Sequence, residues 1–251
     1  MTLFDLSGKV ALISGGNGGI GLAIAEAFAE AGAQVVIGAR DRAKSRAAVA
    51  RVGKGCIDVP LDVTDQASVT GAAEAVRARF GRCDVLVASA GMNIRKPPAD
   101  ITLEDWDQVL RTNLTGTLLL AQALHPLMRD GGGGKIICLG SMYSLFGAPM
   151  VAAYAASKGG VVQLAKSLAA AWAADNIQVN AILPGWVETD LTARARQDVP
   201  TLNDSVLART PAGRWGQPED VAGSAVFLAS RASDFVTGAV LAVDGGYSIR
   251  G

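Results

Sequence analysis

Residues 9–21 are Lys9-Val10-Ala11-Leu12-Ile13-Ser14-Gly15-Gly16-Asn17-Gly18-Gly19-Ile20-Gly21, an apolar run followed by a glycine-rich turn. A helical pattern begins near Ile20, so the stretch predicts a buried strand, a tight turn and a helix. This order directs backbone N–H groups and the positive end of the helix to one point, which suits a pyrophosphate. Glycines at 15, 19 and 21 allow close approach and positive φ. Their spacing is not G-x-G-x-x-G, so the turn alone also fits an ordinary strand–helix connection.

Apolar runs with many β-branched residues recur along the rest of the chain, between longer helical stretches. We predict strands at 10–13, 35–37, 85–88, 136–139, 179–183 and 239–243, with a weaker one at 56–61. We predict helices at 20–31, 65–80, 103–129, 152–174 and 218–229. This alternation is typical of βαβ units, in which helices cover both faces of a parallel sheet. The sequence therefore predicts one α/β domain over residues 1–251, a Rossmann-type doubly wound sheet of about seven strands.

The composition excludes several classes of protein. The 251 residues carry 23 basic and 23 acidic side chains, with no basic cluster that would favour nucleic acid or an anionic membrane. No apolar run approaches the ~20 residues of a membrane span, and the start does not resemble a signal peptide. Cys56, Cys83, Cys138 and His125 lack the spacing of a metal site, and we expect the cysteines in the core. We expect a cytoplasmic protein with a small-molecule substrate and no metal.

A second group of residues lies far downstream of the glycine turn. Ser141 precedes Tyr154 by thirteen residues, and Lys158 follows Tyr154 by four, so both of the latter lie on one helix face. An ammonium beside a phenol favours the phenolate and lowers its pKa from the usual ~10. Tyr154 is then a plausible general acid for ketone reduction and a base for alcohol oxidation. Ser141 can donate a hydrogen bond to the carbonyl oxygen. Together with the glycine turn, this group predicts hydride transfer.

The end of the second strand bears on the choice of dinucleotide. In such folds an acid there binds the adenosine 2′-hydroxyl, whereas arginine accepts a 2′-phosphate. Ala39 stands where the acid is expected and Arg40 follows it, which favours NADP(H) and leaves NAD(H) possible. Asp41 supplies the acid if the register slips by two, and Arg42 also fits a solvated charge at a helix start.

These motifs resemble those of the classical short-chain dehydrogenase/reductase family over essentially the full chain. Gly15, Gly19 and Gly21 match the family's cofactor turn, and Asn113, Ser141, Tyr154 and Lys158 match its catalytic tetrad. The resemblance implies that Asn113 supports a water on a proton relay to the lysine, and that the lysine also holds the nicotinamide ribose. It implies cofactor contacts from Gly15, Asn17, Gly18, Gly19, Ile20, Gly21, Arg40, Asp62, Val63, Ser89, Ala90, Gly91, Tyr154, Lys158, Pro184, Gly185, Val187 and Thr189. Asp62 equally fits a helix-capping acid.

The chain departs from the family pattern at two places. Ala88-Ser89-Ala90-Gly91 replaces the usual Asn-Asn-Ala-Gly, which removes the stabilising asparagines and keeps the Ala-Gly. NADP-preferring members often carry a basic residue just before the second motif glycine. Gly18 stands there, so the case for NADP(H) depends on Arg40 alone.

The segments from Phe4 to Ile24 and from Gly91 to Pro97 resemble the gluconate and deoxygluconate dehydrogenase branch. That resemblance places Arg95 at the substrate, where it could bind a carboxylate in a bidentate manner, although a solvated loop charge is as good an interpretation. Trp186 is expected to shape the substrate pocket with Ser141 and Tyr154, and apolar packing explains it equally well. Residues 190–215 have little periodicity, which suggests a mobile lid or a plain surface excursion. The family resemblance also implies a homotetramer formed through helices 103–129 and 152–174.

Two other functions fit parts of this pattern. A 3-oxoacyl-[acyl-carrier-protein] reductase would have the same tetrad, but acidic carrier proteins call for basic residues around the cleft. Arg129 is available, whereas 173–176 offer no base. A cofactor-binding regulator without chemistry would not need a Tyr–Lys pair.

Overall fold

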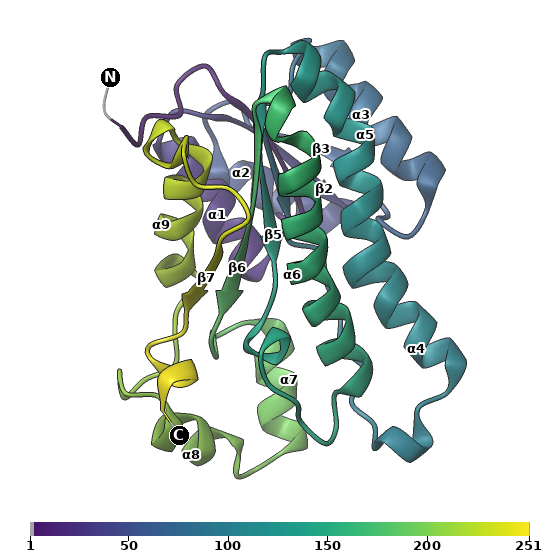
Figure 1. Cartoon of the computed structure of the whole chain (residues 1–251), viewed down its shortest axis with the longest axis vertical. Coiled ribbons are helices and arrows are strands. Elements are labelled where there is room, and N and C mark those ends of the chain that lie inside the picture. Colours follow the sequence, from purple (N-terminus) through teal and green to yellow (C-terminus); the bar gives the residue numbers. More distant parts are fainter. Residues whose placement is uncertain (1–2, 251) are drawn as a thin grey trace.

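The computed structural model describes residues 3–250, and its centre is one parallel sheet of seven strands (Figure 1). The strand order is β3-β2-β1-β4-β5-β6-β7, as expected for a doubly wound fold. The strands are β1 (Val10–Ser14), β2 (Gln34–Ala39), β3 (Ile57–Pro60), β4 (Val85–Ala88), β5 (Gly134–Leu139), β6 (Ile177–Pro184) and β7 (Val240–Val243). The predicted fold class is therefore confirmed, and each predicted strand is present with its ends shifted by two residues at most.

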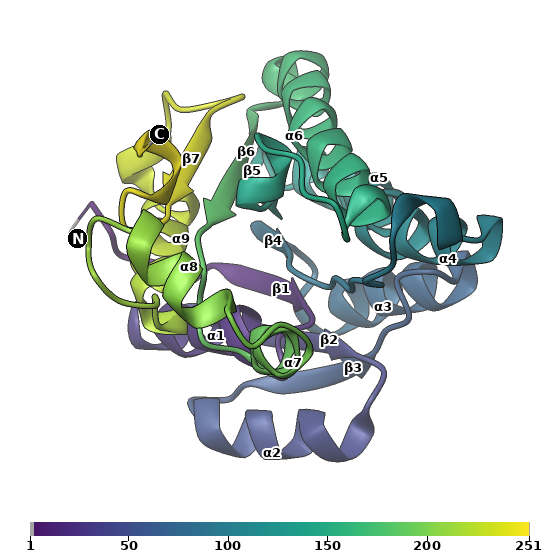
Figure 2. The ribbon, with the colours of Figure 1, turned by 90° about the horizontal axis from the view of Figure 1, so that it is seen from below.

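Helices cover both faces of the sheet because successive strand side chains point to opposite sides. In β1, Ala11 and Ile13 pack against α1 (Gly19–Glu30), α2 (Arg42–Val52) and α9 (Pro218–Ala229). Val10 and Leu12 belong to the other core, beneath α3 (Gln66–Phe80), α5 (Gly116–Asp130) and α6 (Ala152–Trp172). Figure 2 shows the two helical layers on either side of the sheet. The three cysteines are buried, as expected.

Three helical segments differ from the prediction. The helix expected over 103–129 is α4 (Leu103–Leu110) followed by a π-helical turn (Arg111–Thr115) and α5. The polar helix α2 has too few apolar residues for its periodicity to show, and it begins where the Asp41 carboxylate accepts the Lys44 backbone N–H. Within 190–215, the structure has α7 (Asp190–Asp198) and α8 (Leu202–Arg209), where no helix was predicted. Both lie beyond the carboxyl ends of the strands (Figures 1 and 2).

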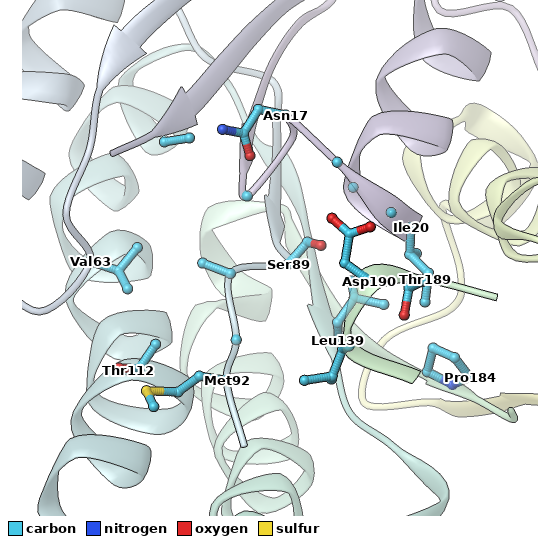
Figure 3. A pocket seen from close by; sticks show the side chains of 18 of the residues that line it. Asn17, Ile20, Val63, Ser89, Met92, Thr112, Leu139, Pro184, Thr189 and Asp190 are labelled. Atoms are coloured by element: carbon cyan, nitrogen blue, oxygen red, sulfur yellow. The ribbon is translucent and has the colours of Figure 1, made fainter. Parts of the chain in front are cut away.

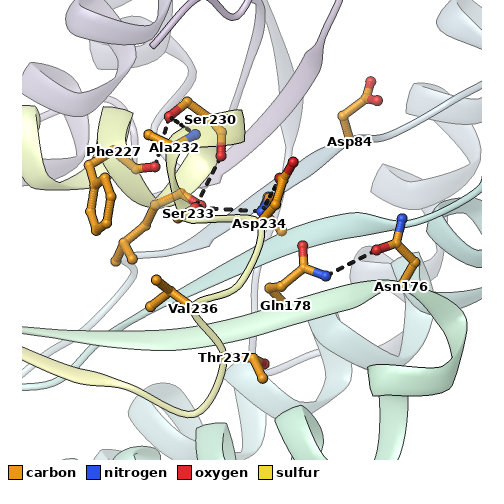
Figure 4. A network of polar contacts seen from close by, with 12 residues as sticks. Asp84, Asn176, Gln178, Phe227, Ser230, Ala232, Ser233, Asp234, Val236 and Thr237 are labelled. Atoms are coloured by element: carbon orange, nitrogen blue, oxygen red, sulfur yellow. Dashed lines mark hydrogen bonds and ion pairs between the residues drawn. The ribbon is translucent and has the colours of Figure 1, made fainter. Parts of the chain in front are cut away.

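The amino-terminal edge of the sheet is closed by a polar network (Figure 4). The Lys135 ammonium, at the start of β5, lies 2.9 Å from Asp234 Oδ1 and 3.5 Å from Ser233 Oγ. Ser233 Oγ in turn donates to the Ser230 carbonyl at 3.1 Å. At the amino ends of the strands these polar groups bond to one another. A ligand site is therefore expected at the carboxyl ends of the strands. Within residues 3–250, no helix has the length and apolar character needed to cross a bilayer.

Candidate active site

A cavity of about 470 Å³ opens at the carboxyl edge, where β1 and β4 are neighbours and the chain crosses over in opposite directions (Figure 3). Such a switch point is where ligands bind in doubly wound sheets. Gly15, Gly19 and Gly21 line one end, and Ser141, Tyr154 and Lys158 line the other. The two motifs that are far apart in sequence therefore share one cavity.

The glycine turn is packed too closely for side chains. A Cβ at Gly21 would lie 2.5 Å from the Gly15 carbonyl oxygen, and one at Gly15 would lie 3.1 Å from the Ala90 backbone. Gly15 and Gly19 also have φ of +66° and +52°, in the region that favours glycine. The turn thus presents backbone rather than side chains to the cavity, as a pyrophosphate cradle requires.

The serine side chain at the end of β1 holds the start of the β4 loop. Ser14 Oγ accepts the backbone N–H groups of Ser89 and Ala90 at 3.1 and 3.2 Å. These two hydrogen bonds stabilise the loop at residues 88–91, which lacks the asparagines expected to stabilise it. They also bring Ser89, Ala90 and Gly91 to the wall of the cavity.

Helix α6 presents Tyr154 and Lys158 to the cavity on one face. The Lys158 ammonium donates to the Leu139 carbonyl at 2.6 Å and lies 5.7 Å from the centre of the Tyr154 ring. Burial lowers the pKa of Lys158 to about 8, because the charged ammonium loses water. Burial also raises the pKa of Tyr154 to about 12, although its hydrogen bond with Ser141 acts in the opposite direction.

The expectation that Lys158 lowers the Tyr154 pKa is therefore wrong. Removal of the phenol from water outweighs any help from the ammonium, which itself holds its proton less tightly than usual. Tyr154 is a protonated phenol over the whole physiological range and is ready to act as an acid.

Asn113 is buried in the π-helical turn between α4 and α5. Its amide accepts from the Met92 backbone N–H at 2.8 Å and donates to the Met92 carbonyl at 2.9 Å and to Ser157 Oγ at 3.0 Å. The side chain does not line the cavity. Asn113 therefore connects the loop after β4 to Ser157 of α6, the residue next to Lys158.

A second cavity, of about 490 Å³, adjoins the first. Both are lined by Ser141, Tyr154, Pro184 and Gly185, so the hydroxyls of Ser141 and Tyr154 stand at the junction. Of these two cavities, Arg95 and Trp186 line the second and not the first. A dinucleotide in the first cavity and a substrate in the second would therefore meet at these hydroxyls.

Known proteins share this chain's sequence and fold. The model of a family described as enoyl-(acyl carrier protein) reductase matches residues 15–248. The gluconate 5-dehydrogenase of Gluconobacter oxydans is 38% identical over 250 residues, which cover 98% of this chain and 97% of the relative. The D-threitol dehydrogenase of Mycolicibacterium smegmatis is 42% identical over 250 residues, 98% of this chain and 95% of the relative. The chain belongs to the short-chain dehydrogenase/reductase family.

A solved structure of this family extends the similarity to three dimensions. The crystal structure of a gluconate 5-dehydrogenase from Burkholderia cenocepacia, in complex with NADP and tartrate, superimposes with a TM-score of 0.95. It is 42% identical and covers 99% of this chain and 98% of that chain.

The structure places every predicted cofactor residue of this short-chain dehydrogenase/reductase on the first cavity. These are Gly15, Asn17, Gly18, Gly19, Ile20, Gly21, Arg40, Asp62, Val63, Ser89, Ala90, Gly91, Tyr154, Lys158, Pro184, Gly185, Val187 and Thr189. Figure 3 shows Asn17, Ile20, Ser89 and Thr189 around it. A nicotinamide dinucleotide fits these residues, since the glycine cradle leaves backbone N–H groups open at one end and the Tyr–Lys pair stands at the other. The four predicted substrate residues, Arg95, Ser141, Tyr154 and Trp186, all line the second cavity.

The two acids left open by the sequence have local partners. The Asp41 carboxylate caps α2. The Asp62 carboxylate accepts the backbone N–H and the hydroxyl of Thr64 at 2.9 and 2.7 Å, and these bonds lower its pKa. Asp62 lines the cavity all the same, while Asp65 is the residue that caps α3.

Sequence reasoning missed Lys44, which lies beside the glycine turn. Its Nζ is 2.9 Å from the position that a Cβ of Gly18 would occupy, and it also lines the cavity. The Lys44 ammonium thus lies beside Gly18, although residues 15–21 contain no basic residue. Predicting helix α2 from the Asp41 cap would have placed Lys44 one turn from Arg40.

Proposed function

We propose that this chain is an NADP(H)-dependent oxidoreductase that moves hydride between the nicotinamide and the secondary alcohol or ketone of a sugar acid. The observation that carries the proposal is the junction of the two cavities at the Ser141 and Tyr154 hydroxyls. A reacting carbonyl at this junction would have a hydrogen-bond donor and a proton donor within reach, next to a cofactor-sized cavity.

Each tetrad residue has a role that its surroundings support. Tyr154 gives its proton to the carbonyl oxygen during reduction and takes one from the alcohol during oxidation. Ser141 donates a hydrogen bond to the same oxygen as negative charge develops on it. Lys158 holds the nicotinamide ribose, and Asn113 positions the loop and helix around Lys158. When bound, the cofactor supplies or accepts the hydride.

Two cations support NADP(H) over NAD(H). Arg40 and Lys44 both line the cavity on the side of β2, where a 2′-phosphate would add negative charge. The Burkholderia relative's crystal structure contains NADP. NAD(H) would leave both cations without this partner.

The sugar acid is proposed from the relatives and from the second cavity. Gluconate 5-dehydrogenase and 2-dehydro-3-deoxy-D-gluconate 5-dehydrogenase, the latter from Bacillus subtilis and 43% identical, share nearly the whole chain. Arg95 gives the second cavity a cation suited to a carboxylate.

We also propose a homotetramer that uses the surface of α5 and α6. Trp172, at the end of α6, stacks on His125 of α5 with ring centres 4.4 Å apart, which locks the two helices into one surface. The cytoplasmic location expected from the sequence and the closure of residues 190–215 as a lid stay predictions.

The decisive experiment is a steady-state assay with NADPH and NADH against 5-keto-gluconate, an acetoacetyl thioester and a neutral cyclic ketone, using the wild-type chain and Tyr154→Phe. We expect turnover of 5-keto-gluconate with NADPH and a loss of at least about 10²-fold in the variant, the usual contribution of a general acid. Preference for the thioester would instead indicate a carrier-protein reductase. A Tyr154→Phe chain that binds NADPH and keeps full biological activity would indicate a regulator.

A further inference from the structure

Three arginines line the second cavity, and none of them has a hydrogen-bond or ion-pair partner among residues 3–250. The side chains of Arg95, Arg194 and Arg209 make no hydrogen bond or ion pair with any of residues 3–250, and Asp198 is the one acid among the lining residues. By contrast, Arg196 and Arg214 in the same part of the chain pair with Glu188 and Asp220. The second cavity therefore has an excess of positive charge available to a ligand.

Arg209, at the end of α8, is the most firmly held of the three. Its Cζ lies 4.7 Å from the centre of the Phe146 ring and 4.4 Å from that of Tyr247, and these two rings are 6.5 Å apart. Contact with two aromatic rings fixes the plane of a guanidinium and is favourable for its charge. The N–H edge of Arg209 is thus oriented before any ligand arrives.

Two buried polar atoms of this cavity lack hydrogen-bond partners. Among residues 3–250 only Asp58 Oδ2, Asn93 Oδ1 and Arg209 Nε are buried side-chain polar atoms without a hydrogen bond, and Asp58 has an ion pair with Arg42. Asn93 and Arg209 both line the second cavity. Leaving such atoms unpaired is costly, and both belong to residues that line this cavity, so a small rotation of either side chain toward a ligand would supply the missing bond.

The two atoms require opposite partners. Arg209 Nε is a donor and needs an acceptor, whereas Asn93 Oδ1 is an acceptor and needs a hydroxyl or N–H. A ligand with a carboxylate and at least one hydroxyl satisfies both. A neutral ketone or an apolar acyl chain does not.

The aromatic side chain of Tyr143 links these groups to the reacting centre. Burial raises the pKa of Tyr143, and the charges of Arg95 and Arg209 oppose that rise, so both arginines act on the same phenol. The Tyr143 ring meets the Tyr154 ring edge-on at 6.1 Å between centres. The cations therefore lie on the substrate side of Tyr154.

We propose that Arg209 is the residue that binds the substrate's carboxylate, with Asn93 accepting a hydrogen bond from a substrate hydroxyl, so that the cavity selects hydroxy acids. This inference rests on the proposed function and adds to it a residue that determines specificity. Arg95, which the sequence singled out, is then a second cation at the same cavity rather than the principal contact.

The test compares Arg209→Gln with the wild-type chain on 5-keto-gluconate and on a neutral ketohexose, with NADPH saturating. Loss of a charged hydrogen-bonded pair predicts a KM for 5-keto-gluconate raised about 10- to 100-fold, with kcat and the kinetics of the neutral ketose changed by less than about threefold. Arg209→Lys should keep the positive charge but lose the two parallel hydrogen bonds of the guanidinium. Its KM for 5-keto-gluconate should therefore be intermediate. Asn93→Ala should raise KM for both hydroxylated substrates.

Binding of tartrate to the protein–NADP complex, followed by calorimetry, gives a readout that does not depend on turnover. We expect Arg209→Gln to weaken it by a similar factor. Arg231→Gln, which removes one positive charge at the opposite edge of the sheet, is the matched control and should leave tartrate binding unchanged. Equal kinetics of wild type and Arg209→Gln on 5-keto-gluconate would overturn the inference while leaving the proposed function intact. A wild-type chain that reduces no sugar acid would overturn the function itself.

Discussion

Lys44 Nζ lies 2.9 Å from Asp190 Oδ2, and this ion pair joins helix α2, beside the cofactor turn, to the first residue of α7. Both residues line the first cavity. Because both side chains are exposed, the pair itself adds little stability. Its position is what matters, since a cofactor phosphate near Gly18 would compete with Asp190 for the same ammonium.

Replacement of Lys44 tests whether it contacts the phosphate that distinguishes NADP(H). We expect Lys44→Gln to raise the KM for NADPH about tenfold, the value of one charged hydrogen bond, with a smaller effect on NADH. Asp190→Asn, which frees the ammonium, should lower the KM for NADPH. Steady-state kinetics with both cofactors measures these effects. An equal rise for NADPH and NADH would mean that Lys44 contacts a group common to both.

Arg40 follows β2 directly and is the cation that the sequence itself assigned to the 2′-phosphate. We expect Arg40→Ala to lower kcat/KM for NADPH by about 10- to 100-fold while NADH changes by less than threefold, since a guanidinium–phosphate pair is a strong charged contact. The ratio of the two kcat/KM values is the quantity to measure. A ratio that does not change would exclude Arg40 as the discriminating residue.

The sequence predicted the sheet well because buried parallel strands are continuous apolar runs, as in Val85 to Ala88, where the bounds agree to the residue. It missed helices α2, α7 and α8 because their surfaces are polar. The starts of α2 and α7 depend on single capping residues, Asp41 and Thr189, and α8 has no side-chain cap. Lys44 was missed for the same reason. Without helix α2, nothing in the sequence brings residue 44 over residue 18.

Replacement of Gly21 tests the pyrophosphate cradle most directly, because backbone atoms occupy the space that a side chain would need. A Cβ there would lie 2.5 Å from the Gly15 carbonyl oxygen and 3.0 Å from Ser89 Oγ. We expect Gly21→Ala to cost about 1–3 kcal/mol of stability, as overpacking does, and to abolish detectable binding of NADPH by fluorescence titration. Gly71→Ala, a helical position with nothing within 4 Å, is the control and should bind normally. Normal cofactor binding by Gly21→Ala would contradict the role given to the turn.

The candidate catalytic residues could be named from motif spacing, but their electrostatics could not be predicted. Spacing of four places Tyr154 and Lys158 on one helix face, and this spacing alone predicts that the ammonium lowers the pKa of the phenol. Burial depends on the packing of β5, β6 and α4 against α6. That is a tertiary property, and it reverses the sign of the shift.

Replacement of Asn113 tests whether this residue positions its neighbours or takes part directly in the chemistry. Replacing it by alanine leaves the Met92 N–H and carbonyl without partners, and unpaired buried groups cost about 1–3 kcal/mol. We expect Asn113→Ala to lower the urea midpoint of unfolding and to reduce kcat more than it raises KM. Ser157→Ala removes one bond to Asn113 and keeps both bonds to Met92. It should therefore retain most activity, and a loss equal to that of Asn113→Ala would contradict this assignment.

The pH dependence of cofactor use follows from Lys158. Its pKa is lowered to about 8, whereas the pKa of Tyr154 is raised to about 12, so between these values the lysine is neutral and the phenol is still protonated. For reduction, kcat/KM for NADPH reports the free enzyme. We expect it to be level below pH 8 and to fall tenfold per unit above it, as Lys158 loses the charge with which we propose that it holds the nicotinamide ribose.

Between pH 8 and 9 unfolding does not account for such a fall, because the linkage at Lys158 has the opposite sign. Above about pH 9 the raised pKa values of the buried Cys56, Cys83 and Cys138 make the folded state less stable as pH rises, so the test is confined to the lower range. Between pH 8 and the unfolded value of 10.5 the unfolded chain binds the extra proton, so this group makes the folded state more stable as pH rises. Circular dichroism between pH 8 and 9 should therefore show a folded protein while the rate falls. A rate that stays level to pH 9 would mean that Lys158 keeps its ordinary pKa, and that the Leu139 carbonyl stabilises its charge more than burial destabilises it.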